Sequence, residues 1–448
     1  MNRYSFRRRP PCAILLGFSI TMVLVTCSPA TAQDQKASSP SSNSLKVDEK
    51  AISETGNGGS IEELLNQLPA EDLEAGKAAQ KEFLKIKAKL VETLGEMRAT
   101  HIRFQNDVDR TPTAIDQYRN LRNISRDLMN SLFESGLEVT RHMPDQEILT
   151  YLVTALEHRT KFDYYDASSM EAGARLIDGG IAQNLSFLYL ATMRSAIVQG
   201  DFELARRLIK VFDIEKLDEV DQKLVYLVDE LETQYKADQE LQKQDDEKGN
   251  NPEVRMITTR GEVTIQLFIN QAPSTVANFI ELVERNYYDG LDFHQVIEHL
   301  LALTGDDSGT GQGNSGKFLL DEHERPDVRR GLAGSLVMAK QPLDNGNFVS
   351  NSASAQFAIL LLPVTSVSKN QTVFGRVTKG LDVIGELRRV DPAKKKKKNE
   401  IVLPPDRILS IEVLKRPETL PEIQYADPNQ VGVSHAGHNH GPATPAAN

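Results

Sequence analysis

The spacing of apolar residues changes once along this 448-residue chain, and that change constrains the fold more than any other feature of the sequence. Between residues 61 and 235, apolar side chains recur three or four positions apart, which is typical of one face of a helix. Beyond residue 253 the period becomes two: Val263, Ile265 and Leu267 alternate with polar residues, as in a half-buried strand. The sequence therefore predicts an all-α helical N-terminal region, residues 61–235, followed by a mainly β domain.

Two segments of the helical region resemble each other. The apolar residues of the first recur at the same spacing in the second: Leu149, Tyr151, Leu152 and Ala155, then Leu185, Phe187, Leu188 and Ala191. Each segment continues after a turn into a second helical pattern, so we expect two helical hairpins. Such hairpins resemble a short tetratricopeptide-type array, which would bind a peptide, although such arrays usually need at least three repeats. The alternative is an ordinary helical bundle that acts as a spacer or associates with a partner protein or a second copy.

The first 32 residues have the three parts of a secretory signal peptide. Basic residues precede an apolar run over residues 13–25, and small residues end the segment at Ala32. We therefore expect an exported protein, periplasmic or extracellular, that begins at Gln33. A lipoprotein signal, in which Cys27 would be acylated, stays open as the alternative. Residues 33–60 are polar and low in complexity, and are expected to form a disordered tether.

A run of charged residues predicts a linker at residues 236–252, before the β domain. Within residues 253–416, short strand patterns are expected at 254–258, 262–267, 292–297, 301–304, 334–339, 356–361, 373–377 and 408–414, with helices at 273–283 and 381–390. Many short strands with two helices favour a closed antiparallel barrel, because closure removes exposed strand edges. Residues 417–448, which contain His435, His438 and His440, are expected to be a disordered tail.

Five blocks of the β domain resemble the cyclophilins. They are GEVTIQLFINQAPSTVANFIELVERNYYDGLDFH from Gly261, GDDSGTGQGNSGKFLLDE from Gly305, GSLVMA from Gly334, AQFAI from Ala355 and TVFGRVTKGLDVI from Thr372. The resemblance covers residues 253–416 and implies an eight-stranded antiparallel barrel with two helices. It also implies peptidyl-prolyl cis-trans isomerase activity on proline-containing polypeptides, with no cofactor.

The resemblance implies where the peptide-binding groove lies, and most residues of that groove are substituted. After Phe293 and His294 the family keeps an arginine, and this chain has Gln295. Gln295 is therefore the candidate catalytic donor, together with Gln356, which keeps the family identity. The groove positions of the family fall on His294, Leu300, Leu301, Leu303, Met338, Ala339, Ala358, Val367 and Gln371.

The exchange of arginine for Gln295 predicts weakened catalysis. Rotation about an X-Pro bond faces a barrier of about 18–20 kcal/mol, and the family arginine donates to the prolyl nitrogen as it pyramidalises. The glutamine amide is neutral, and losing a charge-assisted hydrogen bond could cost roughly 1.5–3 kcal/mol, or about 10- to 100-fold in rate. Ala358 also removes an aromatic wall. Two hypotheses stay open: a weakened isomerase that assists folding, and a non-catalytic cyclophilin-like scaffold that binds a peptide or protein.

Composition and motif context exclude several other functions. The formal charge of -11 repels phosphate backbones, so no nucleic-acid partner is expected. Cys12 and Cys27 are the only cysteines, which leaves the rest of the chain without thiol chemistry or a cysteine-ligated metal. Gly311–Lys317 spells GxxxxGK, but Phe318 stands where a nucleotide site has Ser or Thr, so no nucleotide is expected. The tail histidines would hold a transition metal only weakly, because nothing preorganises them. The lysine run 394–398 is predicted to be a solvated loop, and a patch that meets an anionic polymer or lipid stays open as the alternative.

Overall fold

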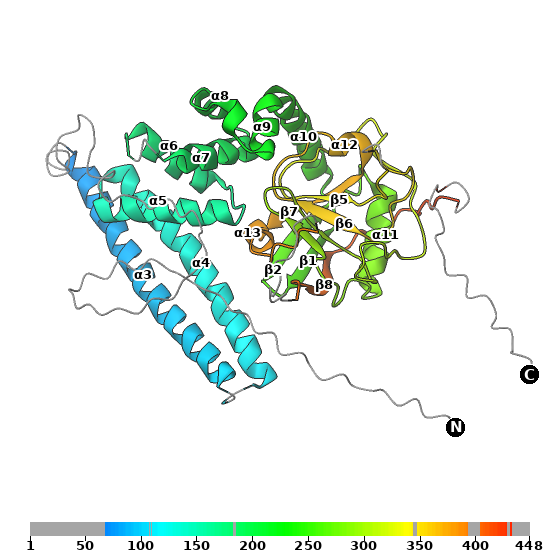
Figure 1. Ribbon diagram of the computed structural model, residues 1–448, viewed down its shortest axis with the longest axis horizontal. Helices are drawn as coiled ribbons and strands as arrows, with labels where there is room; N and C mark the ends of the chain where they lie inside the picture. The colour runs from blue at the N-terminus through cyan, green and yellow to red at the C-terminus, as the bar shows by residue number, and fades with distance from the viewer. Residues whose placement is uncertain are drawn as a thin grey trace, which may run out of the picture.

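The computed structural model describes residues 68–106, 108, 110–181, 185–343, 347–392, 404–427 and 431. These residues form a helical region, up to residue 248, and a β domain that begins at residue 253; the two lie side by side (Figure 1). The predicted signal peptide, the polar segment 33–60, the lysine run 394–398 and the three tail histidines lie outside the described residues. Among the helices of the described part, none is long and apolar enough to cross a membrane.

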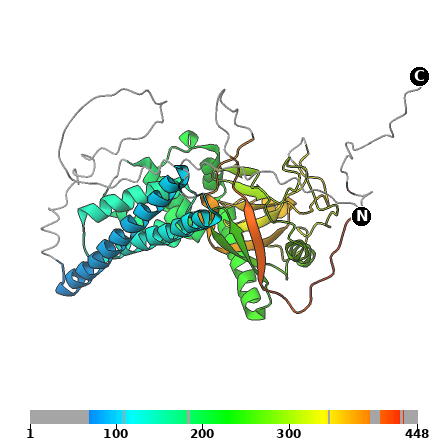
Figure 2. The ribbon, with the colours of Figure 1, turned by 90° about the horizontal axis from the view of Figure 1, so that it is seen from below.

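The first two helices form a long antiparallel pair, and the second of them reaches the β domain (Figure 2). They are α3 (Ala70–Gln105) and α4 (Pro112–His142). One apolar face of α3 points inward, where Phe83 and Leu90 pack with Leu137 of α4 in one buried cluster. The N-terminus of α4 is capped by Thr111, whose hydroxyl accepts the N–H of Ala114 at 3.2 Å.

Two consecutive helix pairs follow: α5 (Gln146–Lys161) with α6 (Ala167–Asp178), and α7 (Ser186–Gln199) with α8 (Phe202–Ile209). Aspartates cap α5, α6 and α8, where each carboxylate accepts a backbone N–H that has no partner within the helix. Gly200, between α7 and α8, has a φ of 81°, a conformation that glycine adopts without steric cost. The structure therefore contains both helical hairpins, while their relation to a tetratricopeptide-type array stays a prediction.

The segment that composition predicts as a charged linker is helical. The short helices η1 (Ile214–Lys216) and α9 (Glu219–Tyr226) lead into α10 (Val228–Lys248), which occupies most of residues 236–252. Asp238 and Asp245 of α10 are buried and form ion pairs with Arg329 of the β domain, at 3.0 and 2.9 Å. These charges therefore belong to an interface, and α10 joins the two parts of the molecule instead of separating them.

The β domain is one eight-stranded antiparallel sheet, as predicted. Its strands are β1 (Glu253–Thr258), β2 (Glu262–Leu267), β3 (Gln295–Ile297), β4 (Leu301–Thr304), β5 (Ser335–Met338), β6 (Phe357–Leu360), β7 (Val373–Lys379) and β8 (Ile408–Lys415). They lie in the order β3-β4-β6-β5-β7-β2-β1-β8. The two ends of the sheet meet just before β3 and β8, where Asp292 bridges Arg407 and the Phe293 N–H donates to the Asp406 carbonyl at 2.8 Å. This contact curls the sheet towards a barrel and covers its edges.

Alternate residues of the strands fill the core of the β domain. In β2, Val263, Ile265 and Leu267 are fully buried, as their period of two predicts. Helices α11 (Pro273–Glu284) and α13 (Leu381–Gly385) pack on the sheet, and the single turn α12 (Val367–Asn370) precedes β7. The predicted helix 381–390 is shorter than expected, because Val390 is instead drawn into backbone pairing with Val296 of β3.

Residues 417–427 pack on the β domain, so the prediction of a disordered tail from residue 417 is wrong for this stretch. Leu420, Ile423 and Tyr425 contact the barrel core. The Lys317 ammonium lies 4.5 Å from the centre of the Tyr425 ring, and Tyr425 also forms a backbone bridge with Leu319. These apolar side chains supply the burial that a disordered segment lacks.

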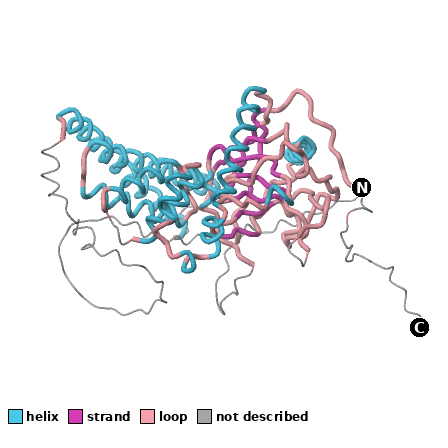
Figure 3. Tube along the Cα trace, turned by 90° about the horizontal axis from the view of Figure 1, so that it is seen from above, coloured by secondary structure: helices cyan, strands magenta, loops and turns pink. Residues whose placement is uncertain are grey.

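The helical region and the β domain meet along a polar, closely packed interface, where the helices on one side adjoin the strands on the other (Figure 3). Arg126 of α4 is 7% exposed, forms an ion pair with Glu386 at 2.7 Å and donates to the Arg260 carbonyl at 2.6 Å. Glycine is required at position 385, because a Cβ there would lie 1.8 Å from the Phe162 carbonyl oxygen. The approach of the two backbones is therefore as close as within one domain.

Candidate active site

Three residues that the sequence places at the site lie in one row across the sheet. Gln295 of β3 pairs with Leu303 of β4, and Leu303 pairs with Ala358 of β6. Residues directly opposite in an antiparallel sheet project to the same face. The neighbouring residues that project to the other face are fully buried in the core: Val296, Ala302 and Ile359. Gln295, Leu303 and Ala358 therefore share the outer face of the barrel.

An apolar cluster adjoins this row on the same face. Leu301 of β4 pairs with Leu360 of β6, and both pack with Val364 and Val367, which follow β6. Val367 and Ala358 are each 7% exposed. The structure thus brings together the predicted Leu301, Ala358 and Val367, and neighbouring side chains already cover most of this apolar surface.

The two candidate catalytic glutamines differ in what their side-chain amides do. The Nε2 of Gln356 donates to two carbonyls of the glycine-rich loop, Gly311 at 3.2 Å and Gly313 at 2.7 Å. Gln356 therefore holds this loop against β6. Gln295 is half-buried, and its amide makes no hydrogen bond to any described residue. Of the two, Gln295 has the amide that is available to a bound peptide.

Four more predicted residues remain, namely Leu300, Met338, Ala339 and Gln371. Of these, Met338 faces the core of the barrel instead of its outer face. Met338 is 2% exposed and belongs to the core cluster, because it follows an outward-facing residue of β5. Its predicted place in the groove is corrected accordingly. The Nε2 of Gln371 donates to the Met338 carbonyl at 3.1 Å, and the Ala339 N–H donates to the Gln356 carbonyl at 2.9 Å. Leu300 is half-buried in the turn between β3 and β4.

His294 precedes Gln295, and its imidazole is enclosed. Its ring nitrogens are shielded from solvent and make no hydrogen bond to the described residues. Burial lowers the pKa of His294, although the negative charges of Asp306 and Asp292 oppose this effect. The imidazole is therefore neutral at pH 7 and supplies no positive charge to replace the arginine that the family keeps next to it.

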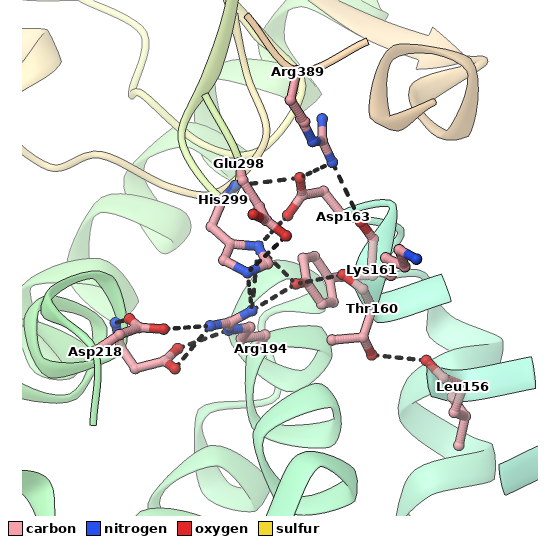
Figure 4. A network of polar contacts seen from close by, with 11 residues as sticks. Leu156, Thr160, Lys161, Asp163, Arg194, Asp218, Glu298, His299 and Arg389 are labelled. Atoms are coloured by element: carbon pink, nitrogen blue, oxygen red, sulfur yellow. Dashed lines mark hydrogen bonds and ion pairs between the residues drawn. The ribbon is translucent and has the colours of Figure 1, made fainter. Parts of the chain in front are cut away.

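The turn between β3 and β4 carries a contact that sequence reasoning missed. His299 occupies this turn with a φ of 60° and points into the helical region, between Asp163 and Arg194 (Figure 4). Its Nδ1 contacts a carboxylate oxygen of Asp163, a fully buried residue that also receives Arg389 at 2.6 Å. No local pattern connects Asp163 with His299, because they are 136 positions apart.

His299 lies between a cation and an anion of the helical region. The Nη1 of Arg194 is 3.1 Å from Nε2 and 3.3 Å from Nδ1 of His299. Nδ1 also contacts the buried carboxylate of Asp163. Arg194 is itself held by Asp221, at 2.7 and 2.8 Å. This arrangement fixes the turn immediately before Leu300, and so helps to position the start of β4.

The helical region also holds the loop after β6. Leu362 of this loop packs with Tyr165 and Met193 in a buried cluster of the helical region. The Nε2 of Gln234, on α10, donates to the Thr365 carbonyl at 3.3 Å. Both loops that flank the apolar cluster of the outer face are therefore anchored on the helical region.

Among the described side chains, no group of three or more His, Asp or Glu residues lies close enough together to hold a metal ion.

The outer face has the parts of a surface for an extended peptide, namely apolar side chains beside one available amide. Such a surface can orient a peptide and donate one neutral hydrogen bond to it.

A family model and several known proteins are similar to about a third of this chain. Residues 253–413 match the family model "Cyclophilin type peptidyl-prolyl cis-trans isomerase/CLD". Peptidyl-prolyl cis-trans isomerase CYP18-2 of Arabidopsis thaliana is 33% identical over 145 residues, which are 32% of this chain and 84% of that protein. Peptidyl-prolyl cis-trans isomerase-like 1 of Mus musculus is 35% identical over 31% of this chain and 81% of that protein. The crystal structure of a Cryptosporidium parvum cyclophilin-type isomerase aligns with a TM-score of 0.31 and 25% identity, over 37% of this chain and 99% of that one. Through its β domain, the chain belongs to the cyclophilin-type peptidyl-prolyl cis-trans isomerase family.

Proposed function

We propose that this protein is an exported peptidyl-prolyl cis-trans isomerase of reduced activity that assists the folding of proline-containing polypeptides. The observation that supports this most is the outer row, in which the available amide of Gln295 lies beside Leu303 and Ala358. Isomerisation needs no covalent intermediate. A surface that binds the peptide and donates one hydrogen bond to the prolyl nitrogen is sufficient to lower the barrier to rotation.

Reduced activity follows from the charge of the donor. A guanidinium donates charge-assisted hydrogen bonds in a rigid fork, whereas the Gln295 amide is neutral and shorter. Neither neighbour compensates, because His294 is enclosed and neutral and the amide of Gln356 is committed to the glycine-rich loop. The loss corresponds to about 10- to 100-fold in rate.

The test compares wild type with Gln295→Arg in a proline-peptide isomerisation assay. Gln295→Arg should raise kcat/KM, by at most about 10- to 100-fold. Thr378→Arg adds the same charge at an exposed position of β7 and should leave kcat/KM unchanged. Wild-type activity equal to that of a relative with the arginine, or no gain from Gln295→Arg while the peptide still binds, would contradict the proposal.

A non-catalytic scaffold is the second candidate, and the covered apolar cluster favours it. A proline ring that binds to this face must compete with Val364 and Val367, which already pack on Leu301 and Leu360. The added variant Ala358→Phe distinguishes the two candidates, since an aromatic wall helps catalysis only if the proline ring reaches it. Peptide binding in the double variant Gln295→Arg with Ala358→Phe, without isomerisation in exchange NMR, would favour the scaffold.

Export is proposed from the N-terminal sequence. The basic start, the apolar run and the small residues before Gln33 support cleavage at that point. Mass spectrometry of the secreted protein should find a mature chain that begins at Gln33 and carries no lipid. An acylated N-terminal Cys27 would replace this proposal with a membrane-tethered lipoprotein.

A further inference from the structure

A single buried carboxylate of the helical region contacts two separate segments of the β domain. Asp163 lies in the loop between α5 and α6, and its side chain is fully buried. One of its carboxylate oxygens contacts the Nδ1 of His299, in the turn between β3 and β4. The other accepts the backbone N–H of His299 at 3.2 Å and the Nη2 of Arg389 at 2.6 Å (Figure 4). Asp163 therefore ties the β3–β4 turn to the segment that contains Arg389.

Both of these segments adjoin β3, the strand that carries Gln295. β3 has three residues and lies at one end of the sheet order, with β4 as its neighbour. Along its other edge, Val296 exchanges two backbone hydrogen bonds with Val390, at 2.8 and 3.0 Å, and Val390 directly follows Arg389. An isolated two-stranded hairpin is at best marginally stable in water. The position of Gln295 therefore depends on how the turn and residue 390 are held.

The contact joins two residues that have an unfavourable backbone conformation. Asp163 has a φ of 55° and His299 a φ of 60°, in the left-handed region that residues other than glycine rarely adopt. Such conformations persist where the surrounding structure imposes them, and they are concentrated at functional sites. Burial of the Asp163 carboxylate adds a desolvation cost, which the contacts with His299 and Arg389 offset. The strain at both residues indicates a role beyond packing.

We propose that Asp163 and His299 are positioning residues, through which the helical region holds β3 and the side-chain amide of Gln295 in place on the outer face. This inference rests on the proposed function, because it gives the helical region a part in the same isomerisation. Asp163 is buried and His299 points into the helical region, so both act through the backbone of β3. The amide donates to the prolyl nitrogen only as that atom pyramidalises. A displaced β3 should therefore lower kcat and leave KM nearly unchanged.

The variant His299→Gly, in the full chain, tests the role of the turn. Glycine adopts a positive φ without strain, so this substitution removes the imidazole and keeps the turn conformation accessible. The kcat for a proline peptide should fall about three- to tenfold, the contribution of one neutral hydrogen bond, while KM stays within about twofold.

A conservative variant and a matched control accompany this measurement. His299→Asn should keep kcat within about twofold of wild type, because asparagine tolerates a positive φ and its amide can donate to Asp163. Asn286→Gly is the control: Asn286 is exposed in the turn after α11 and has a φ of 54°, so the same kind of substitution there should leave kcat unchanged. A loss of kcat in Asn286→Gly as large as that in His299→Gly would overturn the proposal.

Combination with Gln295→Ala shows whether His299 acts through Gln295. In the Gln295→Ala background, His299→Gly should cause no further loss of kcat, because the amide that it positions is absent. An equal loss in both backgrounds would mean a general effect on the fold and would contradict the positioning role.

Hydrogen–deuterium exchange of the full chain, measured by mass spectrometry, tests the positioning of β3 without any activity. In His299→Gly and in Arg389→Met, peptides that contain Val296 or Val390 should exchange at least about tenfold faster, while peptides of β1 and β2 exchange as in wild type. Unchanged exchange at Val296 and Val390 in His299→Gly would refute the proposal. An inactive wild type would refute the proposed function alone, and the exchange result would then decide whether the helical region holds β3.

Discussion

Replacing Arg329 with methionine should destabilise the whole molecule, because this arginine is the centre of the buried contact between α10 and the β domain. Its side chain is 0% exposed and pairs with Asp238 at 3.0 Å and with Asp245 at 2.9 Å. The guanidinium also lies 3.8 Å from the centre of the Phe268 ring. Methionine preserves part of the packing on Phe268 but removes the positive charge between two buried carboxylates.

We expect Arg329→Met to lower the free energy of unfolding by about 3 kcal/mol. This is the lower end of the range of about 3–5 kcal/mol for removing one partner of a buried ion pair. Burial raises the pKa of Asp238, but the charges of Arg376 and Arg329 outweigh it and lower the pKa overall, so the carboxylate is ionised at pH 7. After the substitution Asp238 keeps Arg376, at 2.6 Å. Asp245 keeps hydrogen bonds from Asn270 and Gln271, at 2.9 and 3.0 Å. These remaining partners limit the penalty.

Urea unfolding at pH 7, followed by circular dichroism, measures the effect. Wild type should unfold in one cooperative transition, because α10 is packed into both parts of the molecule. Arg325→Met is the matched control: Arg325 pairs with Asp327 at 3.3 Å but is 40% exposed, so its loss should cost less than about 1 kcal/mol. A loss below about 1 kcal/mol for Arg329→Met, or two separate transitions in wild type, would show that the buried ion pairs do not couple the two parts.

Two further predictions concern the interface and the effect of pH. Gly385→Ala should destabilise the protein by about 1–3 kcal/mol, because the new Cβ would overlap the Phe162 carbonyl oxygen; unfolding within about 0.5 kcal/mol of wild type would mean that the contact is loose. Burial lowers the pKa of His158, His294 and His323. Below about pH 6.5 the unfolded chain therefore binds more protons than the folded chain. The free energy of unfolding should fall from pH 7 to pH 5, by up to about 1.4 kcal/mol per pH unit for each histidine. A series of urea midpoints measures this slope, and His294→Gln should reduce it; an unchanged slope would contradict the assignment.

Strand alternation and the family resemblance predicted part of the candidate site. Its contacts with the helical region were not predicted. Gln295, Leu303 and Ala358 share a face because strands alternate with a period of two, and the family resemblance assigned all three positions to the peptide-binding site. The prediction that Met338 lines the groove was wrong, because its side chain points into the core. The contact of His299 with Asp163 could not be anticipated, since nothing local in the sequence relates a turn of the barrel to the end of α5.

The sequence by itself determined the two kinds of structure in this protein and the family of its β domain, because helical and strand periods are properties of consecutive residues. Tertiary structure alone decided what the charges of α10 do, since whether an aspartate is solvated or buried depends on what lies opposite it. Asp238 and Asp245 resemble solvated linker residues in the sequence, yet they are buried because Arg329, more than 80 positions away, compensates their desolvation. In the same way, Leu420 and Tyr425 belong to the domain only because the barrel offers an apolar surface on which they pack.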